Sequence, residues 1–158
     1  MQPNSLRYPT AKQNEIWLQR REEVRPSTIA EEMEVSRPYV SQAHRIAEER
    51  IEQLLRHASS ILRVDLNHLD PSYGIAAGYW SALESAVYFT YSPQIGVQTW
   101  YRHEGDCSGC NKYEECEAIL YQLSKEWNIE LPAGLPPTEK GAFLFDTVME
   151  ELGWEIQT

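Results

Sequence analysis

The stretch PSTIAEEMEVSRPYVSQAHR, residues 26–45, decides the fold of the first third of this 158-residue chain. Pro26 opens a short helix that the sequence predicts to continue to about Met33. A second helix has a clearer start at Ser36, because a serine side chain caps a helix and because Pro38 falls in the first turn, where a missing N–H costs no hydrogen bond. The sequence therefore predicts two helices joined by a tight turn.

The apolar residues of this stretch suit two helices that cross closely. Such a crossing needs a small residue where the helices touch, and Ala30 stands at that position. The remaining apolar positions are Ile29, Met33, Val35, Val40 and Ala43. Upstream, Thr10 can cap a further helix over residues 11–23, whose apolar stripe contains Ile16 and Trp17. The first third of the chain is thus predicted to be a bundle of three helices.

Residues 10–57 resemble the helix-turn-helix superfamily, specifically the sigma-region-four and LuxR-like group and the archaeal Tfx-type regulators, through IAEEMEVSRPYVSQAHRIAEERI. The resemblance implies that the second helix enters the major groove of double-stranded DNA. Its outward face would then carry Ser36, Arg37, Tyr39, Ser41, Gln42 and Arg45. An amide can pair with adenine, a guanidinium with guanine or phosphate, and hydroxyls with phosphate. The alternative is a three-helix bundle that binds protein.

One residue departs from the pattern of these regulators. The family usually has glycine at the turn, and this chain has Glu34. Glycine favours the left-handed conformation that such a turn uses. Glu34 therefore predicts some backbone strain or a slightly different turn, without excluding the motif.

The helical pattern continues from Pro38 to about Arg63, which is longer than a DNA-reading helix requires. Its apolar residues repeat at intervals of four and three positions, as they do where a helix contacts a partner helix: Ala47, Ile51, Leu54, Ala58 and Ile61. We expect this seam to form the contact of a homodimer, since proteins that read the major groove commonly use two-fold symmetry. The alternative is that the seam packs on the second half of the same chain.

Charge divides the chain into two unequal halves. Residues 1–63 hold 10 of the 14 Lys and Arg residues against nine acids, whereas residues 64–158 hold four bases against 15 acids. DNA would repel the acidic half, which should therefore point away from it. This division predicts a DNA-binding domain over residues 1–63 and an acidic sensing or assembly domain over residues 64–158.

The second half changes from helical to strand periodicity. The turn signal at residues 70–74 is the predicted boundary between the two lobes. Aromatic and β-branched runs at residues 74–80, 86–91 and 96–102 predict a small antiparallel sheet, with a hairpin connection around Ser92 and Pro93. Two helices follow, one starting near Cys116 and one from Thr138 to Leu152, with Gly153 as its stop. The expected fold class is α+β.

All three cysteines lie in one short segment, HEGDCSGCNKYEEC, together with a histidine. The four candidate ligands are His103, Cys107, Cys110 and Cys116. Thiolate and imidazole are the donors that zinc and iron–sulfur centres prefer, and four donors with none left open are typical of a structural site. Asp106, Glu104 or Glu117 could replace the histidine.

Two metal centres compete for this segment. Zinc would tie the last strand to the following helix and stabilise the lobe. An iron–sulfur cluster would make the protein a redox, oxygen or iron sensor. Free thiols are a third possibility.

Together these patterns predict a cytoplasmic transcription regulator and not an enzyme. No catalytic arrangement accompanies the cysteines, and from the apolar pattern we expect neither a signal peptide nor a membrane-spanning segment. A protein-binding adaptor with a structural zinc site is the alternative. If the chain is a DNA-binding regulator, specific binding should depend on the outward face of the second helix. Gln42→Ala together with Arg45→Ala should then abolish specific binding and leave the fold intact.

Overall fold

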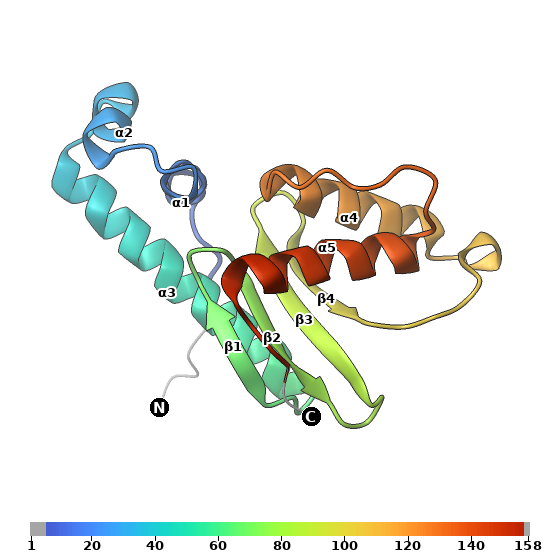
Figure 1. Ribbon diagram of the computed structural model, residues 1–158. Helices are drawn as coiled ribbons and strands as arrows, with labels where there is room; N and C mark the ends of the chain where they lie inside the picture. Colours follow the sequence, from blue (N-terminus) through green and yellow to red (C-terminus); the bar gives the residue numbers. More distant parts are fainter. Residues whose placement is uncertain (1–5, 157–158) are drawn as a thin grey trace.

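A computed structural model describes residues 6–156 and has the predicted α+β class (Figure 1). Its helices are α1 (Ala11–Arg21), α2 (Pro26–Met33), α3 (Arg37–Ile61), α4 (Tyr113–Glu126) and α5 (Pro137–Leu152), with a 3-10 turn η1 (Cys107–Gly109). Its strands are β1 (Leu66–Asp70), β2 (Ile75–Trp80), β3 (Ser85–Ser92) and β4 (Gly96–Tyr101). In the part of the chain that the structure describes, no helix is long and apolar enough to cross a membrane.

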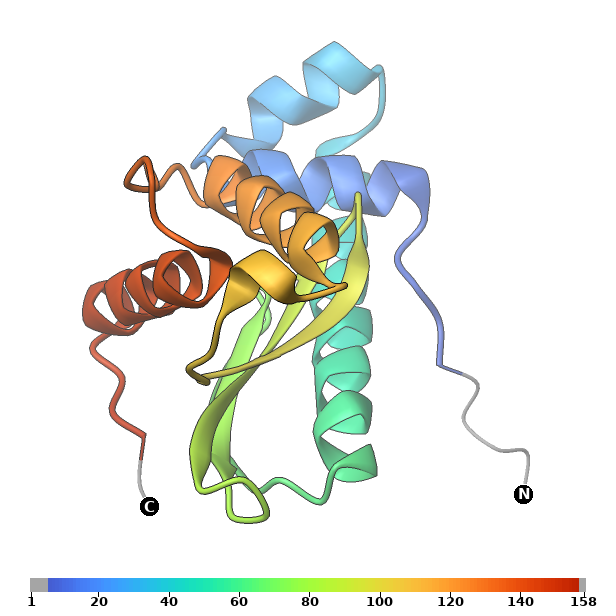
Figure 2. The same ribbon diagram turned by 90° about the vertical axis from the view of Figure 1, so that its right-hand side faces the viewer.

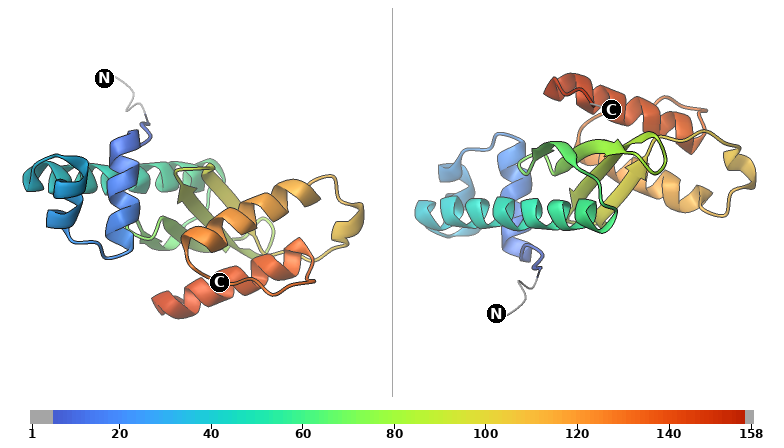
Figure 3. Two further views of the ribbon diagram at one scale, coloured as in Figure 1. Left: turned by 90° about the horizontal axis from the view of Figure 1, so that it is seen from above. Right: turned by 90° about the horizontal axis from the view of Figure 1, so that it is seen from below.

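The three N-terminal helices pack together as their apolar pattern predicts. Thr10 caps α1 through a reciprocal pair of hydrogen bonds with Gln13, at 2.9 and 3.2 Å. The bundle has its own core, made of Ile16, Ile29, Ala30, Val40 and Ala43 with Val24, Met33 and Val35 at its edge. In Figure 3, α1 runs across α3 near one end of the bundle. Capping and apolar spacing therefore predicted these helices correctly.

The turn between α2 and α3 keeps the left-handed conformation without glycine. Glu34 has φ 56° and ψ 45° and caps α2. A non-glycine residue in this region is uncommon and mildly strained. The expected strain at Glu34 is therefore present, and the turn geometry is the one that glycine would adopt.

The four strands form an antiparallel meander in the order β1-β2-β3-β4. The first of them is absent from the sequence prediction, and the turn at residues 70–74 joins β1 to β2 rather than separating two lobes. The Asp70 carboxylate accepts hydrogen bonds from the N–H groups of Ser72 and Tyr73 at 2.9 and 3.1 Å, which closes the hairpin. The predicted boundary was wrong because a turn signal marks a hairpin as readily as a linker.

Both faces of the sheet are covered, so the molecule has three layers. Ala76, Phe89 and Tyr91 pack with α3 and α1 on one face, while Ala77 and Tyr88 pack with α4 and α5 on the other. Figure 2 shows α3 and α5 on opposite sides of the strands. Because successive strand residues point to opposite faces, burial of both faces accounts for the largely apolar sequences of the two central strands, β2 and β3.

The apolar seam of α3 packs on the sheet of the same chain. Ala47 and Ile51 are fully buried there and Leu54 is 5% exposed, whereas Ile61 at the end of the helix is 66% exposed. The expectation that this seam forms a dimer contact is therefore wrong, and the alternative of packing within the chain is confirmed. The apolar period of the seam indicates only that this face of the helix is buried. A sheet can cover such a face as well as a second helix can. Residues on both sides of position 63 thus share one core.

The two C-terminal helices cover the second face of the sheet. Phe145 and Val148 of α5 are buried, and Gly153 ends the helix with φ 67°, both as predicted. Gly141 lies against the indole of Trp100: a Cβ built there would be 2.4 Å from Cζ2 of that ring. The missing side chain lets α5 approach the sheet closely.

Candidate functional site

The exposed N-terminal end of α3 is the first candidate site. All six side chains that the resemblance assigned to DNA are exposed on this end of the helix: Ser36, Arg37, Tyr39, Ser41, Gln42 and Arg45. Val40 and Ala43 lie between them and point into the bundle core. No acidic residue occurs from position 36 to position 47, whereas Glu48, Glu49 and Glu52 follow directly. The helix therefore presents a polar surface without negative charge at one end only.

Two of these residues already have partners within the chain. The Ser36 hydroxyl accepts a hydrogen bond from the N–H of Tyr39 at 3.1 Å and so caps α3. The Arg45 guanidinium forms an exposed ion pair with Glu49 at 2.7 Å. Any contact of Arg45 with an anion has to compete with that pair, which is worth little because both groups are in water.

The cysteine segment forms a loop that projects at the end of the molecule beyond β4 and α4 (Figure 1). Cys107 begins η1 and is buried; its thiol donates a hydrogen bond to the Thr138 hydroxyl of α5 at 3.5 Å. Cys110 is exposed, and Cys116 is half-buried in the first turn of α4. The loop is thus fixed at both ends to helices that cover the sheet.

The three thiols are close enough to affect one another. Burial raises the pKa of the Cys116 thiol, and the charges of Cys110 and Cys107 raise it further. His103 lies outside this group: its Nδ1 is 2.8 Å from the Tyr101 carbonyl oxygen, and its ring lies against that of Tyr101.

Within residues 6–156, no three His, Cys, Asp or Glu side chains are placed together so as to hold a metal ion. The structure therefore brings the cysteines into one region without closing the predicted four-ligand sphere. Spacing identifies donors along the chain, but it does not determine their side-chain directions.

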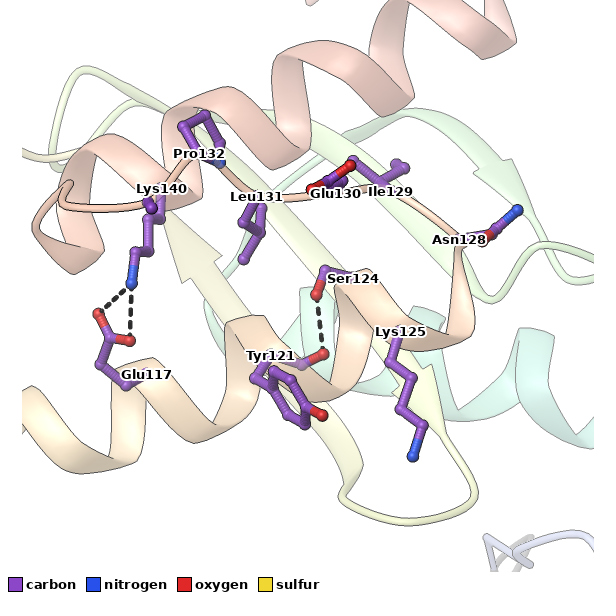
Figure 4. Close-up of a pocket in the computed structure, with 11 residues that line it drawn as sticks. Glu117, Tyr121, Ser124, Lys125, Asn128, Ile129, Glu130, Leu131, Pro132 and Lys140 are labelled. Carbon is purple, nitrogen blue, oxygen red and sulfur yellow. Dashed lines mark hydrogen bonds and ion pairs between the residues drawn. The ribbon is translucent and has the colours of Figure 1, made fainter.

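The open groove in Figure 4 lies between α4 and the segment that leads to α5. Three of the polar side chains that line it have partners within the chain. The Lys140 ammonium donates to both carboxylate oxygens of Glu117, at 3.1 and 2.9 Å, and the Ser124 hydroxyl donates to the Tyr121 carbonyl at 2.8 Å. Among the described residues, none that line this groove has a buried polar atom without a hydrogen-bond partner.

A second cavity, where α1 meets α4, contains charged groups that the sequence reasoning missed. Arg21 and Glu126 both line it, and each has buried polar atoms that make no hydrogen bond. Trp17 and Arg21 stand four positions apart on α1, a spacing that places an aromatic ring and a cation side by side on a helix. That spacing was the available signal for Arg21; nothing local pointed to Glu126.

Comparison with known proteins identifies no relative: no family model, curated protein or solved structure matches this chain. Function must therefore be inferred from the residues and their arrangement.

Proposed function

We propose that this protein is a transcriptional regulator that reads duplex DNA through a helix-turn-helix formed by α2 and α3. The observation that carries the proposal is the exposed, acid-free N-terminal end of α3, with Gln42 and the two arginines Arg37 and Arg45 on it. These side chains can pair with base edges and phosphates in the major groove. The strongly acidic second half of the chain would face away from DNA.

Two double variants of the same helix test this proposal. Gln42→Ala with Arg45→Ala removes one amide and one guanidinium from the N-terminal end of α3. Gln53 and Arg56 repeat these residue types eleven positions later, close to three helical turns and therefore on the same face. Gln53→Ala with Arg56→Ala is the matched control, displaced by about 16 Å along the helix.

Selection of binding sites from random duplex, followed by footprinting, gives the readout. The Gln42/Arg45 variant should lose sequence-specific binding while keeping the wild-type circular dichroism and unfolding midpoint, and the control should keep both. Specific footprinting by the folded Gln42/Arg45 variant would rule out α3 as the reading helix. Absence of selected sequences with wild-type protein would favour the adaptor alternative.

The regulator is proposed to act as a homodimer, because two copies of a short reading helix double the length of sequence recognised. Since the seam of α3 is used within the chain, the dimer contact has to involve another surface. Light scattering with and without a selected duplex tests this: two chains per duplex are expected, and one chain per duplex would refute it.

The cysteine loop is proposed to hold zinc, or alternatively an iron–sulfur cluster, through Cys107, Cys110 and Cys116 with His103 as fourth ligand. The donor set fits either group, because thiolates are soft ligands and a bound cation would offset the repulsion between three neighbouring thiolates. Bound zinc would stabilise the connection between β4 and α4, whereas a cluster would add sensitivity to oxygen or iron.

Metal and acid-labile sulfide content, measured on protein purified without oxygen, distinguishes the two centres. One zinc per chain without colour would make the loop a structural site, and iron with sulfide would make it a sensor. Cys110→Ser should remove the metal, and Ser108→Ala in the same loop should not. Protein that contains neither metal would refute this part of the proposal and leave the DNA-binding part standing.

A further inference from the structure

The cavity between α1 of the N-terminal bundle and α4 of the C-terminal layer has a volume of about 480 Å³. The residues that line it come from three parts of the chain: Leu18 and Arg21 of α1 with its C-terminal cap Glu22, Gln94 of the connection between β3 and β4, and Gln122, Lys125 and Glu126 of α4. Its volume falls in the range of about 300 to 1,000 Å³ that is usual for small-molecule sites. Unlike the groove in Figure 4, it is lined by charged groups that the chain itself leaves unpaired.

Arg21 is the fixed cation of this cavity. Its guanidinium lies over the rings of Trp17 and Tyr73, at 4.6 and 5.1 Å from their centroids, and its Nη2 donates to the Tyr73 carbonyl. The aromatic contacts and this hydrogen bond hold the group in place. Its Nε and Nη1 are buried and make no hydrogen bond. Leaving such donors unpaired is costly, because nothing replaces the water they lose on burial.

Glu126 is the facing anion. Its Oε1 is also buried without a hydrogen-bond partner. Burial raises the pKa of this carboxyl, against the opposing effects of hydrogen bonds from Ser92 and Gln122 and of the charge of Arg21. Arg21 and Glu126 attract each other, yet among the described residues they form no direct ion pair. Two groups of opposite charge, each with at least one buried atom that lacks a hydrogen-bond partner, therefore border one cavity.

We propose that this cavity binds a small zwitterion of the size of a free amino acid. The ligand's carboxylate would accept hydrogen bonds from Arg21, and its ammonium group would donate to Glu126. The amides of Gln94 and Gln122 can donate or accept and would contact the remainder of the ligand. The two charged groups of a zwitterion could interact with Arg21 and Glu126 at the same time, whereas a simple anion would interact with Arg21 alone.

The position of the cavity gives such a ligand a regulatory role. Arg21 belongs to α1 of the three-helix bundle, and Glu126 belongs to α4, whose first turn carries Cys116. A ligand that bridges them would hold the bundle against the C-terminal layer and so favour one placement of α3. This consequence rests on the proposed DNA-binding function; the binding of the zwitterion does not.

Thermal unfolding of the full chain without DNA, in the presence of each of the standard L-amino acids, tests the binding. At least one amino acid should raise the midpoint in a saturable manner, and titration calorimetry should then give its affinity. Glu126→Gln should weaken that affinity at least about 10-fold, because it removes a charge-assisted hydrogen bond. Glu117→Gln is the matched control, since it makes the same change on α4 but in the groove of Figure 4.

The ligand's own two charges provide an independent test. The analogue of the best amino acid that lacks the amino group should bind weakly, and Glu126→Gln should not weaken it further. No saturable shift with any amino acid, or equal losses with Glu126→Gln and Glu117→Gln, would overturn the proposal. Because DNA is absent, these outcomes are separate from success or failure of the DNA-binding experiment.

Discussion

The two halves of α3 belong to one continuous helix but have different surroundings. From Ser36 to Ile46 the outward positions are exposed and free of acid, while the buried residues Val40 and Ala43 belong to the small core of the three-helix bundle. After position 47 the helix lies on the sheet, where Ile51 and Leu55 are fully buried, and its outward positions carry acidic side chains. The sheet thus holds one half of the helix in place, and the other half is presented to solvent.

This difference separates stability from recognition along a single element. Substitutions in the second half should affect unfolding, and exposed substitutions in the first half should affect binding. The predictions that follow test this separation from either side.

The largest effect is expected from Ile51→Ala. The side chain is fully buried between α3 and the sheet, so truncation should cost about 2–5 kcal/mol of unfolding free energy. Urea unfolding measures the loss. Ile61→Ala removes the same atoms from a position that is 66% exposed and should change stability by at most about 0.5 kcal/mol. Equal losses at the two positions would contradict anchoring of the second half by the sheet.

A smaller loss is expected at the boundary between turn and helix. Ser36→Ala removes the hydroxyl that caps the N–H of Tyr39, and this should lower the unfolding free energy by about 1 kcal/mol. Ser41→Ala, one turn further along and exposed, should be close to neutral because alanine is the better helix former. Thermal or urea unfolding distinguishes the two variants. A neutral Ser36→Ala would show that the cap does not hold the N-terminal end of α3.

The smallest effect concerns the balance of charge on the first half. Glu49→Gln breaks the exposed pair with Arg45 and should raise DNA affinity about twofold, since such pairs are worth about 0.3–0.5 kcal/mol. Glu52→Gln makes the same change in net charge but frees Arg56 instead. Fluorescence anisotropy with a selected duplex compares them. Identical gains would attribute the effect to net charge rather than to release of Arg45.

The parts of the fold that were predictable from sequence are those fixed by neighbouring residues. Ser36, Pro38 and Ala30 determine where helices begin and where they touch, and each acts within a few positions of the chain. Strand β1 escaped prediction because LNHLD lacks a run of β-branched or aromatic residues and takes its strand conformation from pairing with β2. Likewise, the seam of α3 indicated a partner, but the sheet that serves as partner is formed by residues far along the chain.

The candidate sites divide in the same way. The six residues at the start of α3 came from the resemblance to helix-turn-helix regulators, and the structure shows that all six are exposed. The spacing of the cysteines identified possible ligands, yet the direction of each thiol depends on contacts such as that between Cys107 and Thr138. Glu126 could not be linked to Arg21 from sequence, because only the packing of α1 near α4 brings them to one cavity.

The length of α3 has a mechanical consequence. Its 25 residues make a rod of about 37 Å that contains no internal glycine and is seated on the sheet at one end. Rotation about the middle of the seated half, near Leu54, acts over the roughly 25 Å to the N-terminal end of the helix. A tilt of about 5° therefore moves that end by about 2 Å, more than half of the roughly 3.4 Å rise between base pairs. In the proposed regulator, a rearrangement of the sheet too small to disturb its hydrogen bonds would therefore be enough to shift Gln42 and Arg45 relative to a DNA sequence.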